Sequence, residues 1–307
     1  MKVTVIHNPA AGDDDTQPSG DKIIRLISKA GHKPKYFSSK DKKWEKALKK
    51  PCDIIAVAGG DGTVGKVARR LIDSRIPIAV LPMGTANNIA NTIGVTGRTF
   101  EDLIAGWNAA SCVNFDAAVA KGPWGTRNFI EGFGVGLFAE TMFRIDNGEH
   151  PHVLRAEDPE AEISAALNVL KKELSSYSPK ELTVRLDGQE VSGDYYMLEA
   201  LNVRYIGPNL DLVPSAKTND GLLDVVLVAK GEQAKLRRYI SDHLGNKRTR
   251  VNLTVRQGRH LQVEWKSSQV HIDDMTWPED KDAKKVLSMA IDIKIDPGAL
   301  VFLKPGA

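Results

Sequence analysis

A glycine-rich stretch with one acidic side chain in its middle is the part of this sequence best suited to chemistry. It consists of Gly59, Gly60, Asp61, Gly62 and Thr63. An apolar, strand-like run precedes it at residues 54–58, and a helical pattern follows at residues 64–72. A helix that begins at such a turn directs free backbone N–H groups and the positive end of its dipole at one point. The stretch therefore predicts a phosphate-binding loop.

Asp61 indicates what kind of phosphate this loop binds. A carboxylate inside a phosphate-binding turn repels the phosphate unless a divalent cation bridges the two groups. We therefore expect ATP with Mg²⁺, and place Asp61 both at the catalytic centre and on the metal. The alternative is a glycine-rich turn that only closes a strand.

Two better-known loops fail to fit these residues. Gly60, Gly62 and Gly65 match the dinucleotide fingerprint, but the acidic residue that should follow about 20 residues later is missing. The P-loop pattern fails at Val67, which stands where a Ser or Thr would hold magnesium.

Two other predicted strands end in similar residues. The strand at residues 78–81 leads into a second glycine loop, from which we expect Gly84, Thr85 and Asn87 to contact the nucleotide. The first strand ends at Asn8, whose side chain either binds the nucleotide or caps its own loop.

The first hundred residues alternate strand-like and helical patterns. Strands are expected at residues 3–7, 35–37, 54–58 and 78–81, and helices at residues 23–30, 44–49 and 64–72. Such alternation predicts a doubly wound parallel sheet with helices on both faces, which binds ligands at the carboxyl ends of its strands. Thr99 and Asp102 resemble a capping box for one more helix, which ends near residue 109.

The remainder of the chain reads mainly as strands and hairpins. Strands are expected at residues 182–186, 191–201, 222–228, 251–255, 261–265 and 270–272, and helices at residues 160–176 and 233–244. This texture predicts an antiparallel, β-sandwich-like domain. We expect an α/β domain at residues 1–115 and a β-rich domain at residues 116–290. The segment of about residues 291–307 reads as two strands that return to the first domain.

Bulk properties exclude several classes of protein. A length of 307 residues fits two domains, and a net charge of +3 is too small to predict a nucleic-acid partner, although it allows approach to an anionic membrane. Cys52 and Cys112 border apolar runs without a partner at metal-ligand spacing, so we expect both to be buried and reduced, as in the cytoplasm. Residues 1–7 lack the apolar core and cleavage site of a signal peptide, so export is not expected. No apolar run approaches about 18 residues, so any membrane contact is expected to be peripheral.

In order and spacing, these motifs resemble the diacylglycerol kinase catalytic family, which includes bacterial lipid kinases, sphingosine kinases and ceramide kinases. The resemblance covers most of the chain. Its elements are Asn8-Pro9, residues 59–63, residues 81–85 with Asn87, Asp116, residues 129–136, and residues 202–224.

The resemblance implies ATP held between the two domains, with residues 59–63 and 84–85 on the phosphates and Asp61 and Asp116 near a catalytic Mg²⁺. It also implies a second, structural cation, bound by the Asp220 carboxylate and by the carbonyl oxygens of Lys217 and Leu222. The alternative there is a plain Asp-Gly turn. The lipid would enter from the second domain, and the protein would work at the inner face of the cytoplasmic membrane.

The chain departs from the family pattern twice. Asn88 stands where the family usually has an Asp, and Met275 stands where it has the Glu proposed as the base. We hypothesise that Asp273 or Asp274 takes the role of the base; the alternative is a solvated turn. A positioned base is typically worth about 10² to 10⁴ in rate, so its loss need not abolish activity.

The acceptor lipid cannot be read from short motifs, and diacylglycerol, a sphingoid base, ceramide and phosphatidylglycerol all stay open. The oligomeric state is equally open, a homodimer included. A basic stretch could meet anionic headgroups or be a solvated face: Lys235, Arg237, Arg238, Lys247, Arg248, Arg250, Arg256 and Arg259.

Two rival functions remain. One is an NAD kinase, which shares the glycine loop but normally carries a Gly-Ser-Thr-Ala-Tyr segment that is absent here. The other is a nucleotide-binding lipid sensor with little kinase activity, which Asn88 and Met275 would suit.

Overall fold

The structure is a computed structural model that describes residues 1–11, 17–247, 249–266, 269–279 and 288–306. The chain divides into two compact units. The first consists of Met1–Asp116 and Gly298–Ala307, and the second of Ala117–Pro297.

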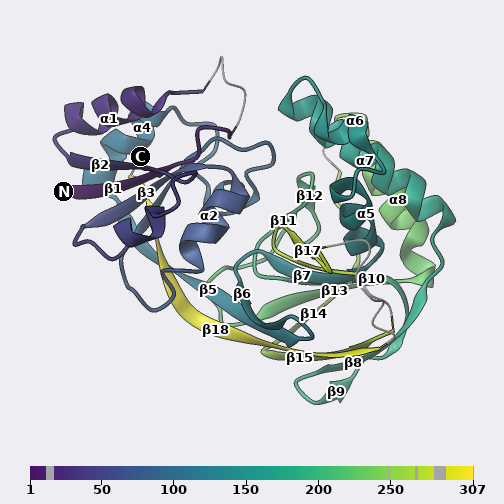
Figure 1. The fold of residues 1–307 in the computed structure, drawn as a ribbon. Coiled ribbons are helices and arrows are strands. Elements are labelled where there is room, and N and C mark those ends of the chain that lie inside the picture. The colour runs from purple at the N-terminus through teal and green to yellow at the C-terminus, as the bar shows by residue number, and fades with distance from the viewer. Residues whose placement is uncertain (12–16, 248, 267–268, 280–287, 307) are drawn as a thin grey trace. The chain divides into compact units, whose positions relative to one another are not determined.

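The first unit is built on a parallel sheet (Figure 1). Its strands β1 (Lys2–His7), β2 (Lys33–Ser38), β3 (Ile54–Gly59) and β4 (Ile78–Pro82) pair in the order β2-β1-β3-β4. β3 is buried along its whole length, as expected for a central strand covered on both faces. The predicted parallel sheet is therefore confirmed.

Helices lie on both faces of this sheet. α1 (Gly20–Lys29) and α4 (Phe100–Ala105) lie on one face, and α2 (Asp61–Ala68) on the other (Figure 1). α3 (Asn88–Ile93) packs beside α2. The Thr99 hydroxyl accepts from the N–H of Asp102 at 3.1 Å, which confirms the predicted cap of α4. The helix expected at residues 44–49 is only a 3₁₀ turn, η1 (Trp44–Ala47), between β2 and β3. A second 3₁₀ turn, η2 (Gly106–Ala109), directly follows α4.

The last residues of the chain complete the first unit. β18 (Met289–Lys304) is one strand of 16 residues, so the prediction of two strands there was wrong. Its residue Phe302 pairs in parallel with Ile78 of β4, and its ring lies 4.6 Å from that of Phe115. Residues 289–297 of the same strand belong to the second unit.

The second unit contains two layers of mainly antiparallel strands with one apolar core between them. One layer has β7 (Gly132–Gly136), β10 (Gly193–Leu201), β13 (Leu223–Ala229), β14 (Thr254–Gly258), β16 (Val270–Ile272) and β17 (Met275–Trp277). The other has β8 (Lys180–Leu186), β9 (Gln189–Glu190), β15 (His260–Trp265) and the first part of β18, with β5 (Ser111–Gly122) and β6 (Gly125–Phe129) alongside. A short separate hairpin joins β11 (Tyr205–Ile206) to β12 (Leu210–Asp211). The β-sandwich-like architecture is thus confirmed, although the strand expected at residues 251–255 begins only at Thr254.

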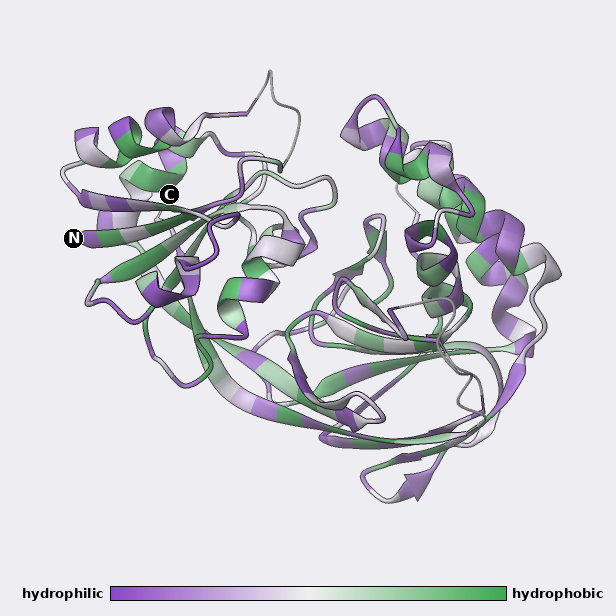
Figure 2. Cartoon of the chain, in the orientation of Figure 1, coloured by the Kyte–Doolittle hydropathy of each residue, from purple (hydrophilic) through white to green (hydrophobic). Residues whose placement is uncertain are grey.

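A second apolar cluster lies under helices α5 (Leu137–Asp146), α7 (Pro159–Ser176) and α8 (Gln233–Leu244). Short elements join them to the rest of the unit: α6 (Pro151–Leu154) before α7, and the 3₁₀ turn η3 (Lys230–Glu232) before α8. Figure 2 shows apolar residues along the strands and inner helix faces, and polar residues on the outer faces. Such amphipathic helices bury one stripe against a sheet.

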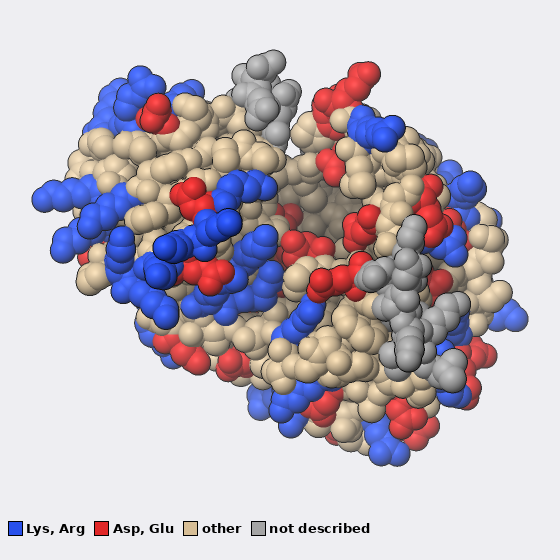
Figure 3. All heavy atoms as spheres, in the orientation of Figure 1, with Lys and Arg blue, Asp and Glu red and all other residues tan. Residues whose placement is uncertain are grey.

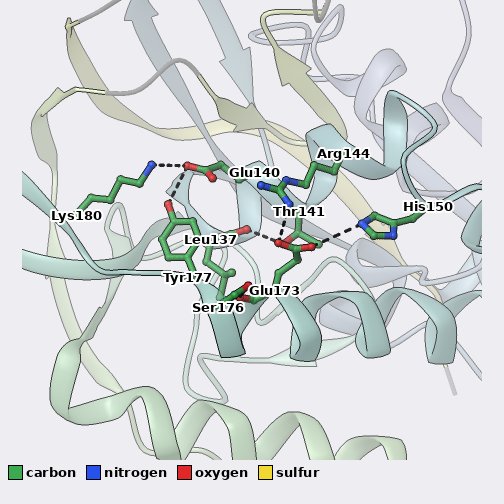
Figure 4. A network of polar contacts seen from close by, with 9 residues as sticks. All are labelled: Leu137, Glu140, Thr141, Arg144, His150, Glu173, Ser176, Tyr177 and Lys180. Carbon is green, nitrogen blue, oxygen red and sulfur yellow. Dashed lines mark hydrogen bonds and ion pairs between the residues drawn. The ribbon is translucent and has the colours of Figure 1, made fainter.

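A polar network ties α5 to α7 and β8 (Figure 4). The Glu140 carboxylate accepts from the Tyr177 hydroxyl at 2.9 Å and from Lys180 at 3.0 Å. Arg144 donates to Glu173 at 2.9 Å. Burial, with the Glu140 charge next, raises the pKa of Tyr177, so its hydroxyl stays a donor at neutral pH.

No helix in the described part of the chain is both long and apolar enough to cross a membrane. Cys112 is exposed and Cys52 is half-buried, so the expectation that both thiols are buried was wrong. Cys112 lies near the start of β5, where the strand is not yet covered by a second layer.

Candidate functional site

The predicted phosphate loop lies between the end of β3 and the start of α2. Gly60 occupies the N-cap position of α2 and, lacking a side chain, makes no side-chain cap. Asp61 and Gly62 form the first turn of the helix, and Thr63 is buried beneath it. The N–H groups of Thr63 and Val64 both donate to the Gly60 carbonyl at 3.0 Å. The start of a helix concentrates backbone N–H groups of the kind that suit an anion.

The second glycine loop packs directly on the first. A Cβ atom added to Gly60 would lie 2.9 Å from the Cα of Gly84, closer than real Cβ atoms approach. The N–H of Met83 donates to the carbonyl of Gly59 at 3.1 Å. Only glycine at both positions allows the two backbones to meet this closely.

Asp61 connects the two loops through its carboxylate. Its oxygens accept from the backbone N–H groups of Asn88 at 2.8 Å and Ile89 at 3.0 Å, at the start of α3. The carboxylate thus caps α3, which starts at a residue whose amide nitrogen has no helical partner. Each carboxylate oxygen can accept more than one bond, so this cap leaves capacity for a cation.

Asn87 and Asn8 shape the rest of this site. Asn87 has a left-handed φ of 50°, and its side chain accepts from the N–H of Gly84 at 2.9 Å and donates to the Gly84 carbonyl at 2.5 Å. Thr85 lies inside that closed turn. Asn8 donates to the Thr63 hydroxyl at 3.3 Å. The structure thus brings the predicted nucleotide-binding residues of three strand ends together in one unit.

The acidic residues expected around magnesium are placed differently. Asp116, which is 1% exposed, accepts from the N–H of Gly298 at 2.7 Å and so anchors the last segment of the chain. Among the described residues, no group of three or more His, Cys, Asp and Glu side chains is arranged to hold a metal. Mg²⁺ typically binds one or two carboxylates, with water and substrate phosphates as the other ligands. Asp61, in the predicted phosphate-binding turn, fits that mode.

The expected structural cation loop lies directly before β13. The Asp220 carboxylate accepts from the N–H of Leu222 at 3.1 Å, and Gly221 has a φ of 71°. Lys217 lies at the start of this loop. Burial, with the charge of Asp220 also contributing, raises the pKa of the nearby Asp224 to about 6. The loop thus concentrates negative charge at a tight turn of the backbone.

The two candidate bases form the two-residue turn between β16 and β17, and they differ sharply. Asp273 is 6% exposed, and its carboxylate accepts from the N–H groups of Ile130, Glu131 and Gly132 at 3.1, 2.8 and 3.2 Å. Asp274 is exposed at the tip of the turn. Of the two, only Asp274 has an exposed side chain.

Comparison with known proteins gives the family. Residues 2–119 match the diacylglycerol kinase catalytic domain, and residues 153–304 match the YegS C-terminal NAD kinase beta sandwich-like domain. The chain belongs to the diacylglycerol kinase family. A diacylglycerol kinase of Mycobacterium tuberculosis is 23% identical, covering 99% of this chain and 95% of its own length. One from Bacillus subtilis is 22% identical over 86% of this chain and 89% of its own.

Solved structures show the same fold. A diacylglycerol kinase from Bacillus anthracis superposes with a TM-score of 0.70 at 20% identity, covering 98% of this chain and 96% of its own. Yeast NADH kinase gives a TM-score of 0.50 at 10% identity, covering 98% and 82%. At these identities the likeness concerns the fold alone.

One buried polar pair in this diacylglycerol kinase family member was not predicted from the sequence. Glu199 and His271 are both at most 1% exposed and lie 2.6 Å apart. The signal was present in the sequence, because Glu199 interrupts the apolar run Met197-Leu198-Glu199-Ala200-Leu201 of a predicted strand. A charged residue at such a position is rarely buried without a partner.

The contact between the two glycine loops gives a first prediction. Gly84→Ala places a Cβ against the backbone of Gly60, and we expect it to lower the free energy of unfolding by about 1–3 kcal/mol, as overpacking typically does. Gly231→Ala is the matched control, because no atom lies within 4 Å of its added Cβ. Urea denaturation measures both. Equal urea midpoints for the two variants would show that the two loops can move apart without loss of stability.

Proposed function

We propose that this protein transfers the γ-phosphate of ATP to the hydroxyl group of a lipid, with Mg²⁺ as the cofactor. The observation that supports this most is the joined pair of glycine loops, at which Asn8, Gly59–Thr63 and Gly84–Asn87 meet around the Asp61 carboxylate. The names of relatives support a lipid as the acceptor. Several are named diacylglycerol kinase. A Klebsiella pneumoniae protein named a probable YegS-like lipid kinase is 28% identical, over 58% of this chain and 57% of its own length.

The residues of this chain have distinct roles in the proposed reaction. The two glycine loops, residues 59–63 and 84–85, bind the phosphates, with the backbone N–H groups at the start of α2 directed at the phosphate oxygens. The N–H groups of Thr63 and Gly84 instead hold the loops in shape, since they donate to the Gly60 carbonyl and to the Asn87 side chain, and Asn8 holds the Thr63 hydroxyl. Asp61 orients α3 and binds Mg²⁺, which when bound neutralises charge on the phosphates. We also propose that Asp116 lies near the same Mg²⁺, although its carboxylate accepts from the N–H of Gly298.

The chemical step forms a bond between the lipid hydroxyl oxygen and the γ-phosphorus and breaks the bond from that phosphorus to the bridging oxygen of ADP. The hydroxyl proton goes to Asp274, the exposed carboxylate of the β16–β17 turn. Asp273 holds that turn through its three backbone contacts. Alignment and charge neutralisation supply most of the acceleration in this class of reaction.

A kinase assay with labelled ATP tests this proposal on diacylglycerol, a sphingoid base, ceramide and phosphatidylglycerol. We expect a phosphorylated product with at least one lipid, and a rate about 10² lower for Asp274→Asn, because a positioned base is lost. Asp194→Asn is the control, an exposed carboxylate on β10. ADP binding without product from any lipid would instead support the nucleotide-binding sensor, which Asn88 and Met275 suit.

We further propose that Asp220 and the carbonyl groups of Lys217 and Leu222 bind a structural Mg²⁺ or Ca²⁺, since all are oxygen ligands at one turn. Ligand binding to the native state alone stabilises it, by about 2.7 kcal/mol at 100 times the dissociation constant. We expect added Ca²⁺ to raise the melting temperature of the wild type but not of Asp220→Asn. An equal rise in both proteins would place the cation elsewhere.

The proposed membrane contact is better supported in the first unit than in the basic stretch of the second. There, Lys235 contacts Glu232 at 3.4 Å, and Arg238 and Lys247 both lie within 4 Å of Asp242. Arg248 lies outside the described residues. In the first unit, residues 33–50 carry eight lysines, all exposed, and only two acidic residues. Figure 3 shows Lys and Arg side chains gathered over this unit.

We therefore propose that residues 33–50 contact the anionic inner face of the membrane. Replacing Lys42, Lys43, Lys46 and Lys49 by Gln should weaken binding to phosphatidylglycerol vesicles at least tenfold, since each surface cation contributes about 1 kcal/mol. The control replaces Lys235, Arg238, Lys247 and Arg250 by Gln. Vesicle co-sedimentation at low and high salt measures both. If only the control variant lost vesicle binding, the membrane contact would have to be assigned to the second unit instead.

A further inference from the structure

A buried acid–base pair lies in the middle of the second unit. Glu199 of β10 is 0% exposed and His271 of β16 is 1% exposed, and Oε2 of Glu199 lies 2.6 Å from Nε2 of His271. Apolar neighbours surround the pair on β10. Apolar side chains in place of a buried ion pair are often at least as stabilising, so stability alone does not account for these two residues.

The strand register shows how the two side chains meet. Glu199 pairs with Gly134 of β7, and Gly134 pairs with His271, so the three residues form one row across three neighbouring strands. Adjacent strands are about 4.8 Å apart, and the outer two residues contact only across the middle one. A Cβ atom at Gly134 would collide with both Glu199 Oε2 and His271 Nε2. The two side chains can therefore meet only because residue 134 has no side chain.

The imidazole of His271 is held on its other side as well. Its Nδ1 lies 3.2 Å from the carbonyl oxygen of Asp273, which can only accept, so Nδ1 carries a proton. The ring of Phe138 packs against it edge-on with centroids 5.3 Å apart. Burial by itself lowers the pKa of His271, but the Glu199 carboxylate and the Asp273 carbonyl outweigh burial and raise it. Burial raises the pKa of Glu199 as well, and a proton between Oε2 and Nε2 accounts for their short separation.

These contacts converge on the turn that carries the proposed base. Asp273 has a left-handed φ of 52°, which costs conformational energy in any residue other than glycine. Its carboxylate is fixed by the N–H groups of residues 130–132, and its carbonyl faces His271. Both the carboxylate and the backbone carbonyl of Asp273 are therefore held in place. Because Asp274 is the next residue in the same turn, these contacts also set the orientation of its backbone.

We propose that Glu199 and His271 are positioning residues that fix the Asp273–Asp274 turn for phosphoryl transfer. The proposal rests on the proposed kinase function for its catalytic consequence. Neither side chain touches the substrate, since both are buried. They act through the backbone of Asp273, and Gly134 is part of the same device.

The decisive variant replaces both residues by apolar ones, Glu199→Leu with His271→Leu, because this removes the polar link without leaving a lone buried charge. We expect a melting temperature close to that of the wild type. We also expect kcat to fall at least tenfold while KM for ATP stays unchanged, because the ATP loops lie in the other unit. Wild-type kcat in this double variant would overturn the proposal.

An NMR measurement reads the same positioning without activity. The amide signals of Ile130, Glu131 and Gly132 report the bonds to the Asp273 carboxylate, and we expect them to move in the double variant and in Gly134→Ala. Unmoved signals in a folded double variant would also overturn the proposal. If the wild type phosphorylates none of the lipids, the proposed function fails, and these signals alone decide whether the pair holds the turn.

Discussion

The contact between Gly60 and Gly84 is the constraint on which the first unit depends. Two parallel strands end side by side, and each is followed by a turn and a helix, so two helix N-termini must share one small volume. Backbones can approach this closely only where neither carries a side chain. The Asp61 carboxylate then serves both turns, since it starts α2 and caps α3. A single acidic residue thus neutralises the partial charge of one helix end while standing beside the other.

The second unit uses a related arrangement in a sheet. Gly134 leaves a gap in the central strand, and the gap lets Glu199 reach His271 two strands away. In both units a missing side chain thus makes a polar contact possible between elements far apart in the chain. Buried polar contacts of this kind favour one arrangement over its alternatives more than they add stability.

Sequence patterns predicted much of this structure, because the period of the apolar residues and the turn residues are local signals. The buried strand at residues 54–58, the glycine loop and the Thr99 cap all depend on neighbours within a few positions. The use of the Asp61 carboxylate was not predictable in this way, since its partners are 27 and 28 residues away. Asp273 was named only as a candidate base, and nothing in the sequence shows that residues 130–132 enclose it. A helix was also expected at residues 44–49, where only one 3₁₀ turn forms.

β18 begins in the second unit and ends in the first, which makes the first unit discontinuous along the chain. Its sheet is complete only when Phe302 lies beside Ile78 and when Asp73 has donated its N–H to the carbonyl of Ala299. Domains made early on the ribosome generally fold first. Here the first unit, although most of it is synthesised first, needs the residues from Gly298 onward, so one edge of β4 stays unpaired until β18 has been made.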